Sequence, residues 1–148
     1  MKNKKLIKIL FSIYILFLIL FVVLKFDGNF ERIISLHNSI IENEKDGIRN
    51  INLIPFRSIS PYLRDITEPY AFKNIAANIV AFIPLGFFIS NKNPKNVFKA
   101  LIICLGVILS IELIQLFFKI GFFDVDDIIL NLTGSLFGLL ISILTRKR

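Results

Sequence analysis

The sequence predicts an all-α integral membrane protein, a four-helix bundle whose N- and C-termini are both cytoplasmic. Three observations lead to this fold class: an apolar composition, long apolar runs, and basic residues confined to alternate segments between them. Of the 148 residues, 55% are hydrophobic and the mean hydropathy is +0.70. Soluble domains contain about 45–50% apolar residues. A chain of this composition is expected to reside in a bilayer.

Each expected span is an apolar run of about the length that crosses a bilayer. The hydrocarbon core is about 30 Å thick and a helix rises about 1.5 Å per residue, so about 20 residues are needed. The runs of this kind are residues 6–25, 72–89, 97–118 and 125–144. The segment 27–70 is too polar to span and is expected to form an external loop. Because no small-x-small cleavage pattern follows the first run, we expect an uncleaved signal anchor in a single membrane domain over residues 1–148.

The expected orientation follows from the distribution of Lys and Arg. Basic residues occupy the N-terminal tail, the segment between the second and third spans, and the C-terminus, and these segments contain no Asp or Glu. The positive-inside rule therefore places all three in the cytoplasm. The net charge of +7 is then a signal of topology. Charges scattered over three short segments do not predict a nucleic-acid surface.

Polar side chains interrupt the last three spans at a common depth. Asn78, Glu112 and Asn131 each lie six residues from the expected outer end of a span. At a rise of about 1.5 Å per residue this depth is about 9 Å. Gln115 and Asp127 lie about one turn shallower. The residues that we expect to bind a ligand in this outer layer are Asn78, Glu112, Gln115, Asp124, Asp127 and Asn131.

Helical spacing predicts that this layer faces the interior of the bundle. Asp127, Asn131, Gly134 and Gly138 share one stripe of the last span. The two glycines form a GxxxG pattern, which allows another helix to approach closely.

Two interpretations of the layer stay open. The Asn and Gln side chains can bond one another and only fix the register of the helices. The carboxylates of Glu112 and Asp127 favour a functional site instead, because two carboxylates without a basic partner stabilise a helix contact poorly. Basic residues from outside the layer could fold over it and pair with these carboxylates. The candidates are Arg57, Arg64, Lys73 and Lys119.

The external segment is expected to hold an amphipathic helix that lies on the membrane surface. Its apolar face would consist of Ile33, Ile34, Leu36, Ile40 and Ile41. The sequence NLIPF at residues 52–56 follows. This motif is expected to form either a lid over the polar layer or a linker packed on top of the bundle.

Four motifs resemble those of the VanZ-like family, in the same order along the chain. They are NLIPF at residues 52–56, NIVAFIPLG at 78–86, ELIQ at 112–115 and DVDDIILNLTG at 124–134. The resemblance covers about residues 50–142 and implies a multi-pass protein of the bacterial plasma membrane with a role at the cell envelope. Its best-known phenotype is resistance to teicoplanin-type lipoglycopeptides, and it implies no catalytic residue. Many members carry an arginine shortly before the aspartate block, where this chain has Lys119.

Three functions from different classes follow from these observations. The first is a protein without catalytic activity that binds a lipid-linked wall precursor or a lipoglycopeptide at the outer leaflet and lowers susceptibility to teicoplanin-type glycopeptides. The second is an intramembrane enzyme that acts on a lipid-linked envelope substrate with Glu112 and Asp127 as acid and base. The third, a proton-coupled exporter, is disfavoured because such sites lie near the bilayer midplane. No motif predicts a cofactor or a metal site, and nothing specifies an oligomeric state.

Overall fold

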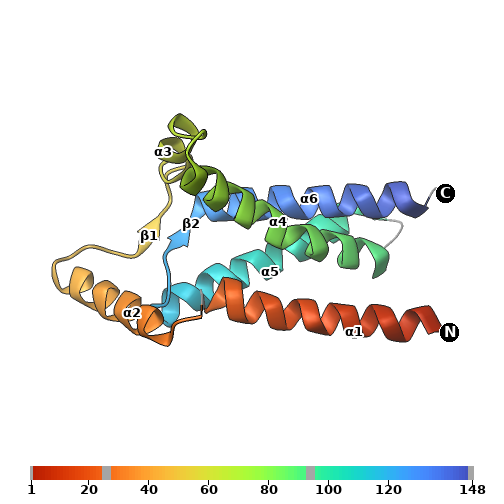
Figure 1. Ribbon diagram of the computed structural model, residues 1–148, viewed down its shortest axis with the longest axis horizontal. Helices are drawn as coiled ribbons and strands as arrows, with labels where there is room; N and C mark the ends of the chain where they lie inside the picture. Colours follow the sequence, from red (N-terminus) through yellow and green to blue (C-terminus); the bar gives the residue numbers. More distant parts are fainter. Residues whose placement is uncertain (1, 25–27, 93–95, 147–148) are drawn as a thin grey trace.

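The computed structural model describes residues 2–24, 28–92 and 96–146, which form a bundle of long helices with shorter elements at one end (Figure 1). The elements in chain order are α1 (Lys2–Phe17), the π-helix η1 (Leu18–Val23), α2 (Phe30–Lys45), β1 (Ile51–Asn52), α3 (Ile59–Arg64), α4 (Pro69–Lys92), α5 (Val97–Phe117), β2 (Phe123–Asp124) and α6 (Val125–Arg146). The fold is therefore mostly helical, as the sequence predicts.

Within these residues, four helices are long and apolar enough to cross a membrane. They are Lys5–Val23, Pro69–Asn91, Val97–Phe117 and Val125–Thr145. Each coincides with a predicted span, and the largest difference is the start of the second, which precedes the predicted residue 72 by one helical turn. Only 11% of the first span and 33% of the last are buried within the protein. Most of their apolar surface is thus left for contact with lipid.

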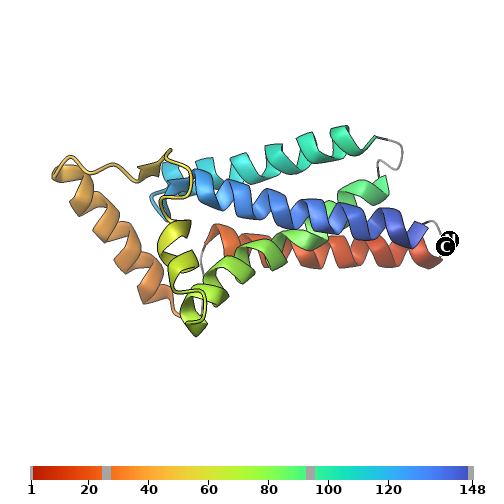
Figure 2. The ribbon, with the colours of Figure 1, turned by 90° about the horizontal axis from the view of Figure 1, so that it is seen from above.

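The two ends of the described chain lie at the same end of the bundle, and α2, α3 and both strands lie at the opposite end (Figure 1, Figure 2). An even number of spans requires this arrangement of the ends. The cytoplasmic location of the termini stays a prediction from the distribution of Lys and Arg. Residues 93–95 of the predicted cytoplasmic segment lie outside the described residues.

Helices α4 and α6 are in close contact because glycines line their interface. A Cβ atom on Gly138 would lie 1.8 Å from the carbonyl oxygen of Ile83, and one on Gly134 would lie 2.0 Å from that of Ile79. Gly86 of α4 is restricted in the same way by α6. The prediction that the GxxxG pattern permits a close helix approach is therefore confirmed, and α4 is the partner helix.

An apolar core joins the helices below the polar layer. Phe82 and Leu85 of α4 pack with Ile108 of α5, and all three are buried. Tyr14 of α1 reaches this core, and its hydroxyl donates to the carbonyl of Ala81 at 3.0 Å. Since a buried hydroxyl needs a hydrogen-bond partner, this bond fixes α1 against α4.

The external segment contains the expected amphipathic helix, which is α2. Its first turn is capped by Asn29, whose side chain accepts from the backbone N–H of Glu31 at 2.8 Å. Ile40 is buried and 1% exposed, whereas Ile34 is 59% exposed. The prediction that this apolar face lies on the membrane surface stays a prediction, and an exposed Ile34 is compatible with it.

A short parallel ladder joins the external segment to the start of α6. In β1 and β2, Ile51 pairs with Phe123 and Asn52 pairs with Asp124. The all-α prediction missed this ladder, because strands of two residues leave no periodic pattern in the sequence. The ladder brings residues 51–59 beside the first turn of the last span.

Candidate functional site

A cavity of about 500 Å³ is lined by residues of α1, η1, α4, α5 and α6, and by Tyr62 of α3 and Asp124 of β2. Figure 1 shows α3 and β2 at one end of the bundle. We name this cavity the polar cavity, after the polar side chains that line it: Ser58, Tyr62, Asn74, Asn78, Glu112, Gln115, Asp124, Asp127 and Asn131. All six residues that the sequence predicts to bind a ligand are among them. The structure thus brings the predicted residues together, and their role in binding stays a prediction.

Asp126, which the sequence did not single out, anchors the external segment. It is 1% exposed, and its Oδ1 accepts from the N–H of Phe56 at 2.5 Å. Its Oδ2 accepts from the N–H of Ser58 at 2.8 Å and from that of Ile59 at 3.2 Å. Hydrogen bonds to a charged acceptor are stronger than neutral ones. This single carboxylate therefore holds residues 56–59 against the first turn of α6.

The anchored segment exposes its apolar side chains. Leu53 is 66% exposed, and Ile54 and Phe56 are each 58% exposed. Phe56 has a φ of 65°, a left-handed conformation that is uncommon for a large side chain and that the bond to Asp126 helps to hold. The expected alternative in which NLIPF packs on top of the bundle is wrong for these three residues. The lid alternative stays a prediction.

Asp124 is the N-cap of α6. Its Oδ1 accepts from the N–H of Asp126 at 2.8 Å, which satisfies one of the unpaired donors in the first turn. The same carboxylate accepts from Asn52 Nδ2 at 2.9 Å and from Ser58 Oγ at 2.5 Å. The backbone N–H of Asp124 donates to Glu112 Oε2 at 3.2 Å. Asp124 therefore connects the external segment, α5 and α6 beside the polar cavity.

Gln115 has a structural bond in addition to its place in the cavity wall. Its Nε2 donates to the carbonyl oxygen of Val22 at 2.7 Å, in the last turn of η1. Carbonyls in the last turn of a helix lack donors within the helix, so Gln115 supplies one from α5. A Cβ atom on Gly121 would lie 3.1 Å from Gln115 Cδ, so the turn after α5 also packs tightly on this side chain. The interpretation as a residue that fixes helix register therefore fits Gln115.

The remaining predicted residues come from three different helices, α4, α5 and α6. Asn78 Nδ2 donates to Asp127 Oδ1 at 3.0 Å, which joins α4 to α6. Glu112 and Asn131 are each 2% exposed. The Oδ1 of Asn131 is buried without a hydrogen-bond partner among the described residues. A buried acceptor in this state costs about 1–3 kcal/mol, which a donor inside the cavity would recover.

The four expected basic partners do not enter the cavity. Within the part of the chain that the structure describes, neither Arg57, Arg64, Lys73 nor Lys119 lines it. Lys119 instead forms an ion pair with Glu44 at 2.5 Å, at the surface. Lys119 is therefore paired away from the layer, and a pairing of Arg57, Arg64 or Lys73 with its carboxylates stays a prediction.

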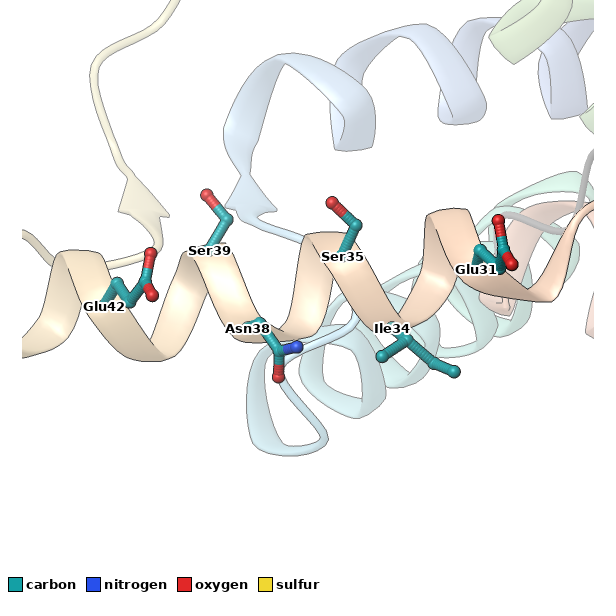
Figure 3. Close-up of a pocket in the computed structure, with 6 residues that line it drawn as sticks. All are labelled: Glu31, Ile34, Ser35, Asn38, Ser39 and Glu42. Carbon is teal, nitrogen blue, oxygen red and sulfur yellow. The ribbon is translucent and has the colours of Figure 1, made fainter.

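A second hollow, of about 420 Å³, lies along α2. Figure 3 shows that its labelled side chains all belong to this one helix. They are Glu31, Ile34, Ser35, Asn38, Ser39 and Glu42. Ligand sites are concave and combine polar groups that converge from several directions. The polar cavity, lined from several helices, is therefore the stronger candidate site.

The four apolar helices indicate a multi-pass helical membrane protein, with a polar cavity at one end of its bundle. The chain belongs to the VanZ/LLP1 family, whose model matches residues 11–146. It is 29% identical over 140 residues to Protein VanZ of Enterococcus faecium, across 93% of this chain and 74% of that protein. No solved structure matches the chain. The resemblance drawn from the four motifs is confirmed.

Proposed function

We propose that this chain is a plasma-membrane protein of the bacterial cell envelope that lowers susceptibility to teicoplanin-type glycopeptides by binding an envelope ligand in the polar cavity. The observation that carries the proposal is the cavity itself, whose wall includes Asn131, a residue with a buried Oδ1 that has no hydrogen-bond partner in the described part of the chain. Membership of the VanZ/LLP1 family supports the role at the envelope.

The proposed orientation places the cavity in the outer leaflet. Its lining includes residues of α3 and β2. These elements lie at the end of the bundle opposite the two described chain ends (Figure 1), and the positive-inside rule assigns those ends to the cytoplasm. Lipoglycopeptides act outside the membrane, and their lipid tail would concentrate them at the same leaflet. An outward cavity can therefore meet either the drug or the wall precursor that the drug recognises.

The residues that we propose to bind the ligand are distinct from those that connect the cavity wall to the external segment and to η1. Asp124 and Gln115 are bonded mainly to other parts of the protein. Asn78, Glu112, Asp127 and Asn131 are contributed by three different helices and are proposed to contact the ligand.

The test is the surface binding of fluorescent teicoplanin to a sensitive Gram-positive host that expresses the protein. We expect the wild type to lower drug binding, and Glu112→Gln or Asp127→Asn to restore it. These variants keep the shape of the side chain and remove its charge. Glu42→Gln makes the same change on the exposed face of α2 and is expected to behave as the wild type. Membrane levels are compared by blot.

Two results would contradict the proposal. If the wild type leaves drug binding unchanged at good expression, the chain does not act on these drugs. If the wild type lowers drug binding and all three variants match it, the protein acts without the carboxylates of the polar cavity.

A second candidate is an intramembrane enzyme for a lipid-linked envelope substrate. The favouring observation is that Glu112 of α5 and Asp127 of α6 line the same cavity, as an acid and a base must. Such an enzyme would change the lipid-linked species extracted from expressing cells, and Glu112→Gln would abolish the change. Mass spectrometry of the extracts distinguishes the two candidates, because a protein that only binds leaves their chemical composition unchanged.

A further inference from the structure

We infer that the polar cavity takes the sugar headgroup of a lipid-bearing molecule, whose hydrocarbon tail leaves between the first helix and α4. This inference rests on the proposed function in one respect, the use of the polar cavity as the binding site. It adds the chemical class of the ligand and the route of the tail.

The walls of the cavity change from polar to apolar on one side. Its apolar lining comes from Phe17 of α1 and from Phe21 and Val22 of η1. The small residues Ala77 and Ala81 line it from α4. Phe21 is 51% exposed, and it belongs to a span of which only 11% is buried within the protein. The exposed apolar lining on this side is therefore where we place the exit of an alkyl chain.

The polar side of the cavity favours a neutral headgroup over an anionic one. Glu112, Asp124 and Asp127 supply carboxylates, and the described residues that line the cavity include no Lys, Arg or His. A phosphate would meet like charges in a partly dehydrated space, where their repulsion is much stronger than in water. Phosphate-binding sites provide cations or clusters of free N–H donors instead.

Hydroxyl groups match the remaining side chains better than an ammonium group does. The buried Oδ1 of Asn131 needs a donor, and Asn74 offers an amide that both donates and accepts. A sugar hydroxyl both donates and accepts, so it can satisfy both residues. An ammonium only donates and would leave the amide N–H groups without an acceptor.

The size of the cavity is consistent with a headgroup alone. Its volume of about 500 Å³ lies in the lower part of the range of ligand pockets, about 300–1,000 Å³. A complete lipid would not fit, so the tail must lie outside. A membrane glycolipid and the acylated sugar of a lipoglycopeptide both combine a sugar with a hydrocarbon tail, so either could supply such a ligand.

The test is native mass spectrometry of the full chain released from nanodiscs. The nanodiscs contain equal amounts of diglucosyl diacylglycerol, phosphatidic acid and stearylamine in phosphatidylcholine. The protein is purified without alkyl-glycoside detergents, whose sugar headgroups would compete for the cavity. A second set of nanodiscs receives teicoplanin, which separates the two sources of the sugar.

We expect the glycolipid adduct to exceed both of the others in the wild type. Asn131→Leu removes a buried acceptor and its hydrogen bond to the ligand, and should weaken the glycolipid adduct about tenfold. Asn74→Ala, on an exposed part of the cavity wall, provides a second variant if Asn131→Leu does not fold. Ser110→Ala changes an exposed position of α5 outside the cavity and is expected to match the wild type.

The outcomes are distinct. A preference for phosphatidic acid or stearylamine overturns the inference, as does a glycolipid adduct that neither cavity variant weakens. Displacement of the glycolipid by teicoplanin supports it and identifies the drug as a source of the sugar. If the glycolipid binds while drug binding to cells is unchanged, the ligand class stands and the proposed function fails. If drug binding to cells falls and no glycolipid or teicoplanin adduct forms, the proposed function stands and the inferred ligand class fails.

Discussion

The carboxylate of Asp126 should determine whether the external segment stays attached to the last span. Replacement by asparagine keeps the size of the side chain but removes the charge and one acceptor oxygen. The remaining oxygen can still accept from Phe56, as Oδ1 does in the wild type. The new NH₂ group would then face the N–H groups of Ser58 and Ile59, which bond to Oδ2 in the wild type. Two donors would lose their acceptor.

The loss can be estimated from these bonds. A hydrogen bond to a charged group contributes about 1.5–3 kcal/mol, so the loss of two gives at least about 3 kcal/mol. Because about 1.4 kcal/mol corresponds to a factor of ten, the segment should open about 100-fold more often. The fold of the four spans should be unaffected, since the apolar core that joins them contains residues of the spans and none of the external segment.

Hydrogen exchange followed by mass spectrometry measures this opening directly in the protein in nanodiscs. In Asp126→Asn, a peptide that covers residues 54–60 should exchange about 100-fold faster than in the wild type. Asp127→Asn provides a matched control, because it makes the same change at the adjacent position, where the carboxylate accepts from Asn78 of α4. Equal exchange in the wild type and Asp126→Asn would refute the role of Asp126. Faster exchange in both variants would show a general effect of charge at the start of α6.

Two further predictions concern the packing of the spans. Gly138→Ala should lower the thermal midpoint and cost about 1–3 kcal/mol, because the added Cβ would lie 1.8 Å from the Ile83 carbonyl oxygen. Gly106→Ala is the control: its added Cβ would meet nothing within 4 Å, and helix propensity should stabilise the fold by up to about 1 kcal/mol. A thermal midpoint of Gly138→Ala above that of the wild type would contradict the close contact between α4 and α6. Gln115→Leu should cost about 1–3 kcal/mol by leaving the Val22 carbonyl without its donor, and an unchanged midpoint in the same nanodiscs would show that this bond is not needed.

The spans could be predicted because each is a long pattern with one dominant cause. A helix that crosses a bilayer needs an apolar run of about 20 residues, and such a run is visible without knowledge of its neighbours. The common depth of Asn78, Glu112 and Asn131 followed from the rise of the helix, and the structure places all three around one cavity. The close approach at Gly134 and Gly138 followed from the absence of a side chain.

The connections outside the spans could not be predicted in the same way. The bonds from residues 52–59 to Asp124 and Asp126 join positions that are about 70 residues apart in the chain. Strands of two residues carry no periodicity, and a serine at position 58 has no special pattern around it. The pairing of Lys119 with Glu44 likewise depends on where α2 lies, which the sequence did not specify.

The three aspartates of the DVDD sequence show why an acidic cluster is not evidence of catalysis by itself. Carboxylates are favoured at the start of a helix because its unpaired N–H groups carry partial positive charge. Successive residues of a helix point about 100° apart, so neighbouring carboxylates reach different partners. Asp124 caps the helix, Asp126 anchors the external segment, and Asp127 bonds to Asn78 in the wall of the polar cavity. Asp124 and Asp126 both bond to Ser58 of the anchored segment. Asp127 lines the polar cavity and bonds to Asn78 of α4, so of the three it is the one whose isosteric change is proposed to test function.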